Sequence, residues 1–253
     1  MKNGEALYIV IPAYNEAENI ADCVNDWYPI VQRHDGSGRS RLVVVDDGSQ
    51  DNTLRLLREM AADRPLLEPL TKPNGGHGPA VLFGYRYAIA RGADYIFQTD
   101  SDGQTNPDEF EPFWKNRLDC DAVLGYRPHR GDGWTRKVVE QVVCALLRLI
   151  FRVKVRDANA PFRLMRSELV ARYIGKLPEN YNIPNIMFTT YFAYNHEKVC
   201  FLPVSFHPRK KGSNSINVRK IFGIGWQALG EFRAFRRDMG PLKEPFTGET
   251  GKE

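Results

Sequence analysis

Residues 41–49 read RLVVVDDGS, an apolar run that leads directly into two aspartates. The arrangement returns at residues 94–102, DYIFQTDSD, and a third apolar run, ALYIVI, occupies residues 6–11. Strands that are apolar at consecutive positions are typical of parallel sheets buried on both faces. The sequence therefore predicts buried strands over 6–11, 41–45 and 94–98.

Segments with helical spacing separate these strands, and they cover residues 15–31, 53–62, 80–91 and 107–118. Residues 65–70 are interpreted as a short strand or a loop, and residues 121–125 as a fourth strand. Alternating strands and helices predict an α/β fold with a mostly parallel sheet and helices on both faces. Ligands in such folds bind beyond the carboxyl ends of the strands, where the acidic clusters lie.

The second half of the chain is less regular. We predict a helix over 134–151, a loop leading into a strand over 157–165, a strand over 198–203, a basic loop over 207–217 and an amphipathic helix over 218–238. Neither an internal repeat nor a linker divides the chain. We therefore expect one domain over residues 1–240 and a flexible polar tail over 241–253.

Composition sets broad limits on the class of protein. Hydrophobic residues make up 42% of the 253 residues and charged residues 26%, which excludes a wholly disordered chain, a collagen and a disulfide miniprotein. A net charge of +4 does not predict a nucleic-acid partner.

Two further features bear on the cellular compartment. The four cysteines, Cys23, Cys120, Cys144 and Cys200, are far apart without a metal-ligand spacing, and we interpret them as free thiols in a reducing cytosol. A signal-like N-terminus is not seen, and no stretch approaches the ~18 apolar residues of a spanning helix. We expect a cytoplasmic protein, or one attached to the cytoplasmic face of a membrane.

Asp100 and Asp102 follow the strand at 94–98 directly. Two carboxylates at this spacing can converge on a hard divalent cation, which would offset the charge of a diphosphate. The alternative is a pair of solvated turn residues.

Asp47, after the preceding apolar run, is a candidate to accept hydrogen bonds from a base or a ribose. Ser49 or Asp51 can instead cap the helix at Thr53.

A glycine-rich loop, NGGHG at residues 74–78, precedes the helix at 80–91. Glycine allows close backbone approach, and a helix N-terminus favours an anion. The role of His77 stays open between a ligand contact and a structural hydrogen bond.

Two basic groups are candidate phosphate ligands, because arginine matches phosphate geometry; the alternative is a solvated surface. The groups are Arg127, Arg130, Arg136 and Lys137, and the loop residues Arg209, Lys210 and Lys211.

Three motifs occur in order: VIPAYNE at 10–16, VVDDGSQD at 44–51 and TDSDGQ at 99–104. Together they resemble glycosyltransferase family 2. Within it the chain is most similar to the dolichol-phosphate mannosyltransferase / polyprenyl-phosphate glycosyltransferase branch, because DANAPFRL at 157–164 and Arg209-x-x-Gly212 are similar to the later motifs of that branch.

The resemblance implies a GT-A fold with a nucleotide-sugar half over about 1–126 and an acceptor half over about 127–240. It implies a UDP- or GDP-hexose donor and a lipid phosphate or glycan acceptor. For the donor, it implies Pro12, Tyr14, Glu16 and Asp47 at the base and ribose, the Asp100-Ser101-Asp102 segment at Mg²⁺ or Mn²⁺ and the diphosphate, and Gln104 near the sugar or the metal. It also implies Arg209 at the donor diphosphate, and Arg127 and Arg136 at an acceptor phosphate.

The resemblance implies inverting transfer of a hexose to polyprenyl phosphate, which needs no general base. The alternative is transfer to a hydroxyl in cell-surface glycan or glycolipid synthesis, which needs one, and Asp157 is the candidate. Asp157 can equally be a loop residue that orients Arg163 or caps a turn. Glu140 stands where a small hydroxyl residue is expected and would repel a phosphate. The late lysine of the branch is missing, and Lys210 and Lys211 are candidates to replace it. A nucleotide-sugar-binding module without catalysis is a third possibility.

The helices at 138–151 and 218–238 combine apolar and basic residues. Each is predicted either to lie at a membrane surface or to pack on the core, and for residues 138–151 a dimer contact is a further alternative.

Overall fold

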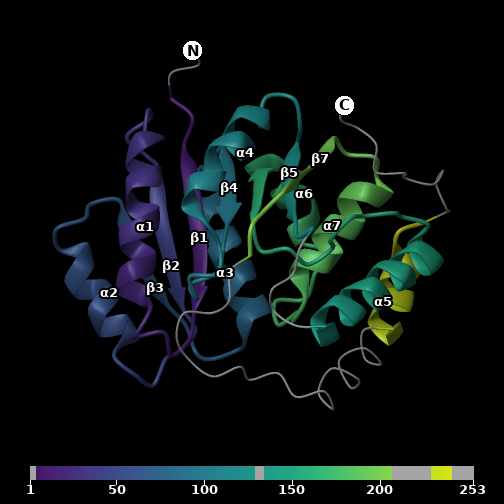
Figure 1. The fold of residues 1–253 in the computed structure, drawn as a ribbon, viewed down its shortest axis with the longest axis horizontal. Coiled ribbons are helices and arrows are strands. Elements are labelled where there is room, and N and C mark those ends of the chain that lie inside the picture. Colours follow the sequence, from purple (N-terminus) through teal and green to yellow (C-terminus); the bar gives the residue numbers. More distant parts are fainter. Residues whose placement is uncertain (1–3, 129–133, 207–228, 241–253) are drawn as a thin grey trace.

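The computed structural model describes residues 4–128, 134–206 and 229–240, with the backbone alone for 134–138. Seven strands form one sheet in the order β3-β2-β1-β4-β6-β5-β7 (Figure 1). Their bounds are β1 Leu7–Ala13, β2 Arg41–Asp46, β3 Leu67–Thr71, β4 Tyr95–Gln98, β5 Ala122–Tyr126, β6 Arg163–Arg166 and β7 Val199–Pro203.

The first half builds a parallel sheet around β1, which pairs with β2 on one side and β4 on the other. β3 extends the sheet beyond β2, so residues 65–70 contain a strand. Alternate residues of β1 point to opposite faces: Leu7 and Ile9 pack with α1 (Ile20–Arg33), whereas Tyr8 and Val10 pack with α3 (His77–Ala90). The predicted α/β fold with helices on both faces is confirmed.

Gly84 sets the distance of α3 from the sheet. A Cβ atom there would lie 2.4 Å from Val10 Cγ1 and 3.1 Å from Val45 Cγ2. The missing side chain lets α3 lie directly on β1 and β2, which brings its N-terminus to the ends of both strands.

The second half departs from the parallel pattern at β6, which is antiparallel to both β4 and β5. The other helices, with one 3₁₀ turn, are α2 Thr53–Ala61, η1 Pro107–Glu109, α4 Phe110–Asn116, α5 Trp134–Phe151, α6 Ser167–Ile174 and α7 Pro184–Tyr194. Residues 229–238 are helical too, whereas the rest of the predicted 218–238 helix and the tail at 241–253 lie outside the described residues.

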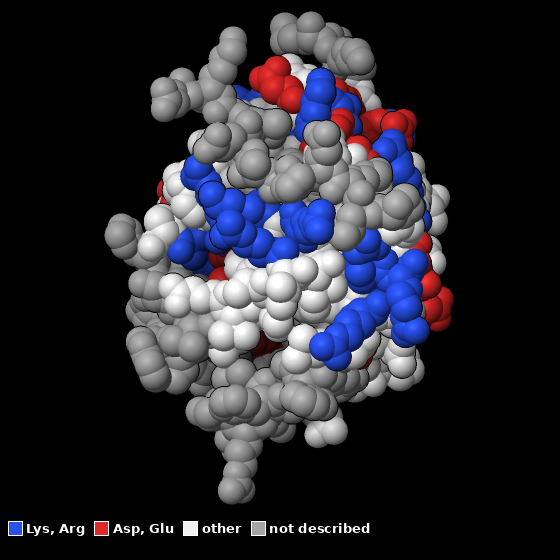
Figure 2. Space-filling model, turned by 90° about the vertical axis from the view of Figure 1, so that its right-hand side faces the viewer, with Lys and Arg blue, Asp and Glu red and all other residues white. Residues whose placement is uncertain are grey.

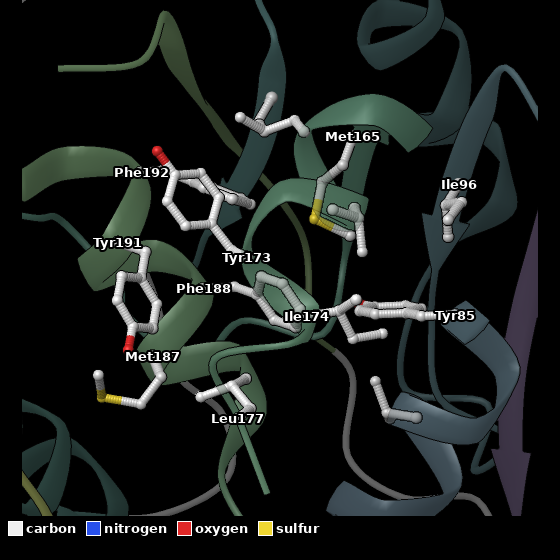
Figure 3. Packing of buried hydrophobic residues seen from close by; sticks show 14 of the residues in the cluster. Tyr85, Ile96, Met165, Tyr173, Ile174, Leu177, Met187, Phe188, Tyr191 and Phe192 are labelled. Carbon is white, nitrogen blue, oxygen red and sulfur yellow. The ribbon is translucent and has the colours of Figure 1, made fainter. Parts of the chain in front are cut away.

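The sequence prediction includes neither α6 nor α7, and the surroundings of α7 explain its absence from the prediction. Every residue of α7 is buried, so the helix carries no amphipathic periodicity. Figure 3 shows Phe188, Tyr191 and Phe192 of this helix packed with Tyr173 and neighbouring residues in the core of the second half.

The free-thiol interpretation is wrong for two of the four cysteines. Cys120 and Cys200 form a disulfide across 80 residues of sequence, with their Cα atoms 6.0 Å apart. Parallel pairing of β5 with β7 brings them together, which spacing along the chain does not reveal. Cys23 and Cys144 carry free thiols.

Within the described parts of the chain, the helices are too short or too polar to qualify as membrane spans.

Candidate functional site

A cleft of about 750 Å³ opens at the carboxyl ends of β1, β2 and β4. This is the edge at which the sequence predicts ligand binding. Seven of the predicted donor-site residues line it together: Pro12, Tyr14, Glu16, Asp47, Asp100, Ser101 and Asp102. Gln104 is buried, and the described lining of the cleft does not include it.

The two predicted metal ligands lie on the wall of this cleft. Asp100 Oδ1 lies 3.0 Å from His77 Nε2, and Asp102 Oδ1 accepts a hydrogen bond from the backbone N–H of Gln104 at 3.2 Å. Burial lowers the pKa of His77, but attraction to the Asp100, Asp102 and Asp47 carboxylates outweighs it, so the pKa lies above its ordinary value. His77 thus makes a structural hydrogen bond, one of the two possibilities that the sequence left open; a ligand contact stays a prediction.

Asp47 is almost fully buried and organises the glycine-rich loop. Its carboxylate accepts hydrogen bonds from the backbone N–H groups of Gly75 and Gly76, at 3.1 and 2.7 Å, and from Lys72 Nζ at 2.5 Å. The sequence analysis missed Lys72, although its position directly after β3 places it at the same sheet edge. Asp47 therefore holds the loop that forms one wall of the cleft.

Gly48 is required for this contact between strand end and loop. Its φ is +68°, and a Cβ atom there would lie 2.8 Å from the backbone nitrogen of Asn74. Any side chain would push the loop away from Asp47.

A second loop, after β1, carries Tyr14 and Glu16. Ser49 Oγ accepts from the backbone N–H of Asn15 at 2.9 Å, and Asp51 Oδ2 accepts from that of Ala17 at 3.1 Å. Asp51 Oδ1 also accepts from the backbone N–H of Thr53 at 2.9 Å. Asp51 thus hydrogen-bonds at the start of α2, as predicted, and also ties the loops after β1 and β2 together.

Glu16 lies below the surface of this wall, whereas Tyr14 is 44% exposed at the mouth of the cleft. Glu16 Oε2 accepts from Asn19 Nδ2 at 2.7 Å. The wall thus offers an exposed aromatic ring beside a buried carboxylate, a combination that can stack on a flat ring and accept its hydrogen bonds.

A separate cluster of charges surrounds Arg127, which follows β5. Arg127 pairs with Asp157 through two hydrogen bonds, Nε to Oδ2 at 2.7 Å and Nη2 to Oδ1 at 3.1 Å. Glu140 Oε2 lies 4.0 Å from the same guanidinium, and Glu140 Oε1 accepts from the backbone N–H of Ala158 at 2.8 Å. Burial of Arg127 and Asp157, each about 5% exposed at the side chain, makes this a closed ion pair.

The sequence suggests two structural functions for Asp157, capping a turn and orienting Arg163, and both concern the loop at 157–160. Asp157 Oδ1 accepts from the backbone N–H of Asn159 at 3.0 Å, so the carboxylate does cap a turn. Arg163 is fully buried and donates to the carbonyl oxygens of Ala160 and Asn185, at 3.0 and 3.2 Å. Burial lowers the pKa of Arg163. The loop is thereby fixed between β6 and α7.

The remaining basic candidates cannot be placed from the structure. Arg130 and Arg209–Lys211 lie outside the described residues, and Arg136 and Lys137 are described by their backbone alone.

The family model and the curated relatives that match this chain all describe glycosyl transferases. The model of the family described as glycosyl transferase family 2 matches residues 8–238. The chain is 26% identical over 223 residues to the polyprenol monophosphomannose synthase of Mycolicibacterium smegmatis, covering 84% of this chain and 82% of that protein. It is 25% identical over 222 residues to the undecaprenyl-phosphate 4-deoxy-4-formamido-L-arabinose transferase of Edwardsiella ictaluri, covering 85% of this chain but only 64% of that protein.

Among solved structures, the chain resembles glucosyl-3-phosphoglycerate synthase from Mycobacterium tuberculosis in complex with Mn²⁺, uridine diphosphate and glucosyl-3-phosphoglycerate. The TM-score is 0.66 at 18% identity, with 95% of this chain and 82% of that chain covered. The predicted GT-A fold is confirmed, and the resemblance drawn from the three motifs agrees with the family model and with the names of the curated relatives.

Proposed function

The chain belongs to glycosyl transferase family 2, and from this premise we propose that it is an inverting, metal-dependent hexosyltransferase that uses a nucleotide-diphosphate sugar and polyprenyl phosphate. The observation that carries the proposal is the cleft at the ends of β1, β2 and β4, which brings Asp47, Asp100 and Asp102 together. The curated relatives, named for polyprenyl-phosphate transfer, supply the acceptor class.

On the donor side, we assign the base and ribose of a UDP- or GDP-hexose to the wall formed by Pro12, Tyr14, Glu16 and Asp47. The diphosphate then lies along the Asp100-Ser101-Asp102 segment, with Gln104 next to the sugar. Arg209, outside the described residues, is proposed to hold the diphosphate from its loop.

The residues present fit a divalent cation. Asp100 and Asp102 offer hard carboxylate oxygens on the cleft wall, the donor set that Mg²⁺ and Mn²⁺ share with substrate phosphates. Among the described residues, no group of three or more His, Cys, Asp or Glu side chains is placed to hold a metal ion. We assign the cation to Asp100 and Asp102, together with the donor diphosphate, because they lie on the cleft wall. Bound there, Mg²⁺ or Mn²⁺ would offset the charge that develops on the leaving diphosphate.

On the acceptor side, a phosphate is already ionised near neutral pH and attacks the anomeric carbon in line with the leaving group. This chain then needs to orient the acceptor rather than remove a proton. We assign that role to Arg127 and Arg136, with the loop at 157–160 supporting Arg127.

One observation favours a second candidate, transfer to a hydroxyl of a glycan or glycolipid. The guanidinium of Arg127 is closed on Asp157 and lies near Glu140, which reduces its attraction for a phosphate. In this alternative Asp157 would act as the general base, which requires the acceptor hydroxyl to come within hydrogen-bond reach of its carboxylate.

We further propose that residues 1–240 form one catalytic domain, with a donor half over about 1–126 and an acceptor half over about 127–240, and that it works at the cytoplasmic face of a membrane. β6 supports a single domain, because it pairs with β4 of the first half on one side and with β5 on the other.

The test is a transfer assay with UDP- and GDP-sugars and Mn²⁺ or Mg²⁺, with and without a short-chain polyprenyl phosphate in detergent. Formation of a glycosyl phospholipid, detected by mass spectrometry, supports the proposal. Donor hydrolysis that the lipid phosphate does not accelerate favours the hydroxyl acceptor. Donor binding without any turnover, unchanged in Asp102→Ala, would point to a binding module.

A further inference from the structure

The loop at 157–160 is held at both polar groups of one backbone residue. Glu140 Oε1 accepts a hydrogen bond from the N–H of Ala158 at 2.8 Å. The carbonyl oxygen of the same residue accepts from Arg163 Nη2 at 3.4 Å and from Thr189 Oγ1 at 3.0 Å. Ala158 is fully buried, so these side chains fix the backbone of the loop inside the protein.

This backbone contact is connected to the acceptor side of the site. Glu140 lies in the second turn of α5, and Ala158 follows Asp157 directly in the chain. Asp157 in turn forms two hydrogen bonds with the Arg127 guanidinium, at 2.7 and 3.1 Å. The orientation of Arg127 therefore depends, through Asp157 and Ala158, on where the Glu140 carboxylate lies.

The charges around the loop are balanced among the described side chains. Glu140 and Asp157 are the acids, and Arg127 and Arg163 are the bases, so the four ionised groups sum to zero. Glu140 Oε2 lies 4.0 Å from the Arg127 guanidinium. Glu140 thus does not leave the loop with a net negative charge, and its carboxylate is accommodated beside a site for an anionic acceptor.

The carboxylate of Glu140 is turned into the protein although cations are common outside. Figure 2 shows the side of the molecule on which α5 lies in Figure 1, and Lys and Arg side chains gather on that surface. The Glu140 side chain is only 15% exposed, and its Oε1 contacts the Ala158 N–H and Cys144 Sγ. Its contacts thus serve the loop rather than a surface ion pair.

We propose that Glu140 is a positioning residue for the transfer reaction. By holding the N–H of Ala158, it keeps Asp157 and Arg127 in the orientation that receives the acceptor. The inference deepens the proposed function and rests on it, because it concerns the acceptor side of that site. The described lining of the donor cleft includes none of these residues, so donor binding should not depend on Glu140.

The alternative is that only the charge of Glu140 acts, through its proximity to Arg127. Two substitutions separate reach from charge. Glu140→Gln removes the charge but retains an oxygen that can accept from the Ala158 N–H. Glu140→Asp retains the charge, but its side chain is shorter by one methylene group and cannot reach that N–H unless the helix or the loop moves.

The test compares transfer with donor hydrolysis in each variant, with a short-chain polyprenyl phosphate in detergent as the acceptor. Glu140→Ala and Glu140→Asp should lower kcat/KM for the acceptor about tenfold or more, because misplaced orienting groups cost up to about 100-fold. Glu140→Gln should stay within about threefold of wild type, since a neutral hydrogen bond is weaker than a charge-assisted one. Donor hydrolysis without acceptor and the donor Kd should change by less than about twofold in all three, because the donor cleft is a separate site.

Glu197→Ala is the matched control for a loss of stability. Glu197 is 14% exposed, against 15% for Glu140, and its carboxylate accepts hydrogen bonds from Arg172 and Tyr173. It precedes β7, at the edge of the sheet opposite to Arg127. A variant that only unfolds more readily loses transfer and donor hydrolysis by the same factor. The ratio of the two rates should therefore be unchanged in Glu197→Ala and should fall in Glu140→Ala.

Two results would overturn the inference. One is a wild-type ratio of transfer to hydrolysis in both Glu140→Ala and Glu140→Asp. The other is loss of transfer in Glu140→Gln with full transfer in Glu140→Asp, which would assign the effect to charge alone. Thermal unfolding identifies variants that fail to fold, and the Gln and Asp variants decide the question even if Glu140→Ala is one of them.

Failure of the proposed function gives a different result. A wild-type chain that transfers to no acceptor removes the function and this inference with it. Wild-type transfer, with the same ratio of transfer to hydrolysis in every Glu140 variant, removes the inference and leaves the function. If the wild-type chain transfers to a hydroxyl acceptor instead, the same comparison applies with that acceptor, because Asp157 is then the base that Glu140 positions.

Discussion

The two charged regions of this molecule differ in what their charges contact. In the cleft at the ends of β1, β2 and β4, Asp100 and Asp102 lie on the wall, where Asp100 also contacts the His77 ring. Beyond β5, Arg127 and Asp157 neutralise each other in the protein interior. Similar residues therefore serve two purposes, since carboxylates on the cleft wall can contact a ligand that enters the cleft, whereas the buried pair holds a loop in place.

Removing a carboxylate from the cleft wall tests this difference most directly. Asp102→Ala should lower kcat/KM by about 10³-fold or more, because the proposed cation would lose one of its two carboxylates. The unfolding midpoint in urea should change little. Asp63→Asn, at an exposed position on the surface, is the control and should retain full activity. Full activity in Asp102→Ala would show that Asp100 and Asp102 do not form the cation site.

The closed pair should respond in the opposite way. Asp157→Asn should lower the free energy of unfolding by about 3 kcal/mol, because a neutral amide replaces the carboxylate that forms two hydrogen bonds with the buried Arg127 guanidinium. Urea denaturation measures this change, and Arg127→Met/Asp157→Leu should regain part of the loss. Unchanged stability together with abolished transfer would instead identify Asp157 as the general base of the hydroxyl-acceptor alternative.

Asp47 belongs to both classes, because it lines the cleft and also holds its loop. Asp47→Ala should cost about 2 kcal/mol of unfolding free energy, since it leaves Lys72 and the N–H groups of Gly75 and Gly76 without this acceptor. Donor affinity, measured by calorimetry, should fall as well. Lys72→Met retains the carboxylate and should cost less in both measurements, and an equal cost would assign the effect to the lysine.

The smallest effect concerns Asp51 at the rim of the cleft. Burial raises the pKa of Asp51, but hydrogen bonds from Thr53 and Ala17 lower it more, so its pKa lies below the ordinary value. A carboxyl group with a depressed pKa in the folded state contributes stability above its unfolded pKa of about 3.9, and loses it as pH falls through the folded value. Asp51→Asn should therefore lose less stability than wild type between about pH 5 and pH 2, measured by urea unfolding across pH. Parallel curves for the two proteins would contradict this assignment.

The same contrast explains what could be predicted from the sequence. The strands and acidic motifs of the first half follow one another locally, so apolar runs that end in Asp47 or Asp100 place those residues at one sheet edge. The Arg127–Asp157 pair, the Cys120–Cys200 disulfide and α7 depend on contacts between distant segments. Spacing along the chain does not encode which partner a buried charge meets, and a helix that is buried on all sides has no periodicity to detect.

The place of β6 in the sheet has a consequence for synthesis on the ribosome. β6 lies between β4 and β5, yet its residues are made after both, so β4 has an unpaired edge while residues 99–162 emerge. An apolar strand with an open edge is a template for pairing with other chains. Nascent chains that stall before Arg163 should therefore be the aggregation-prone species, and they are where a chaperone would be needed most.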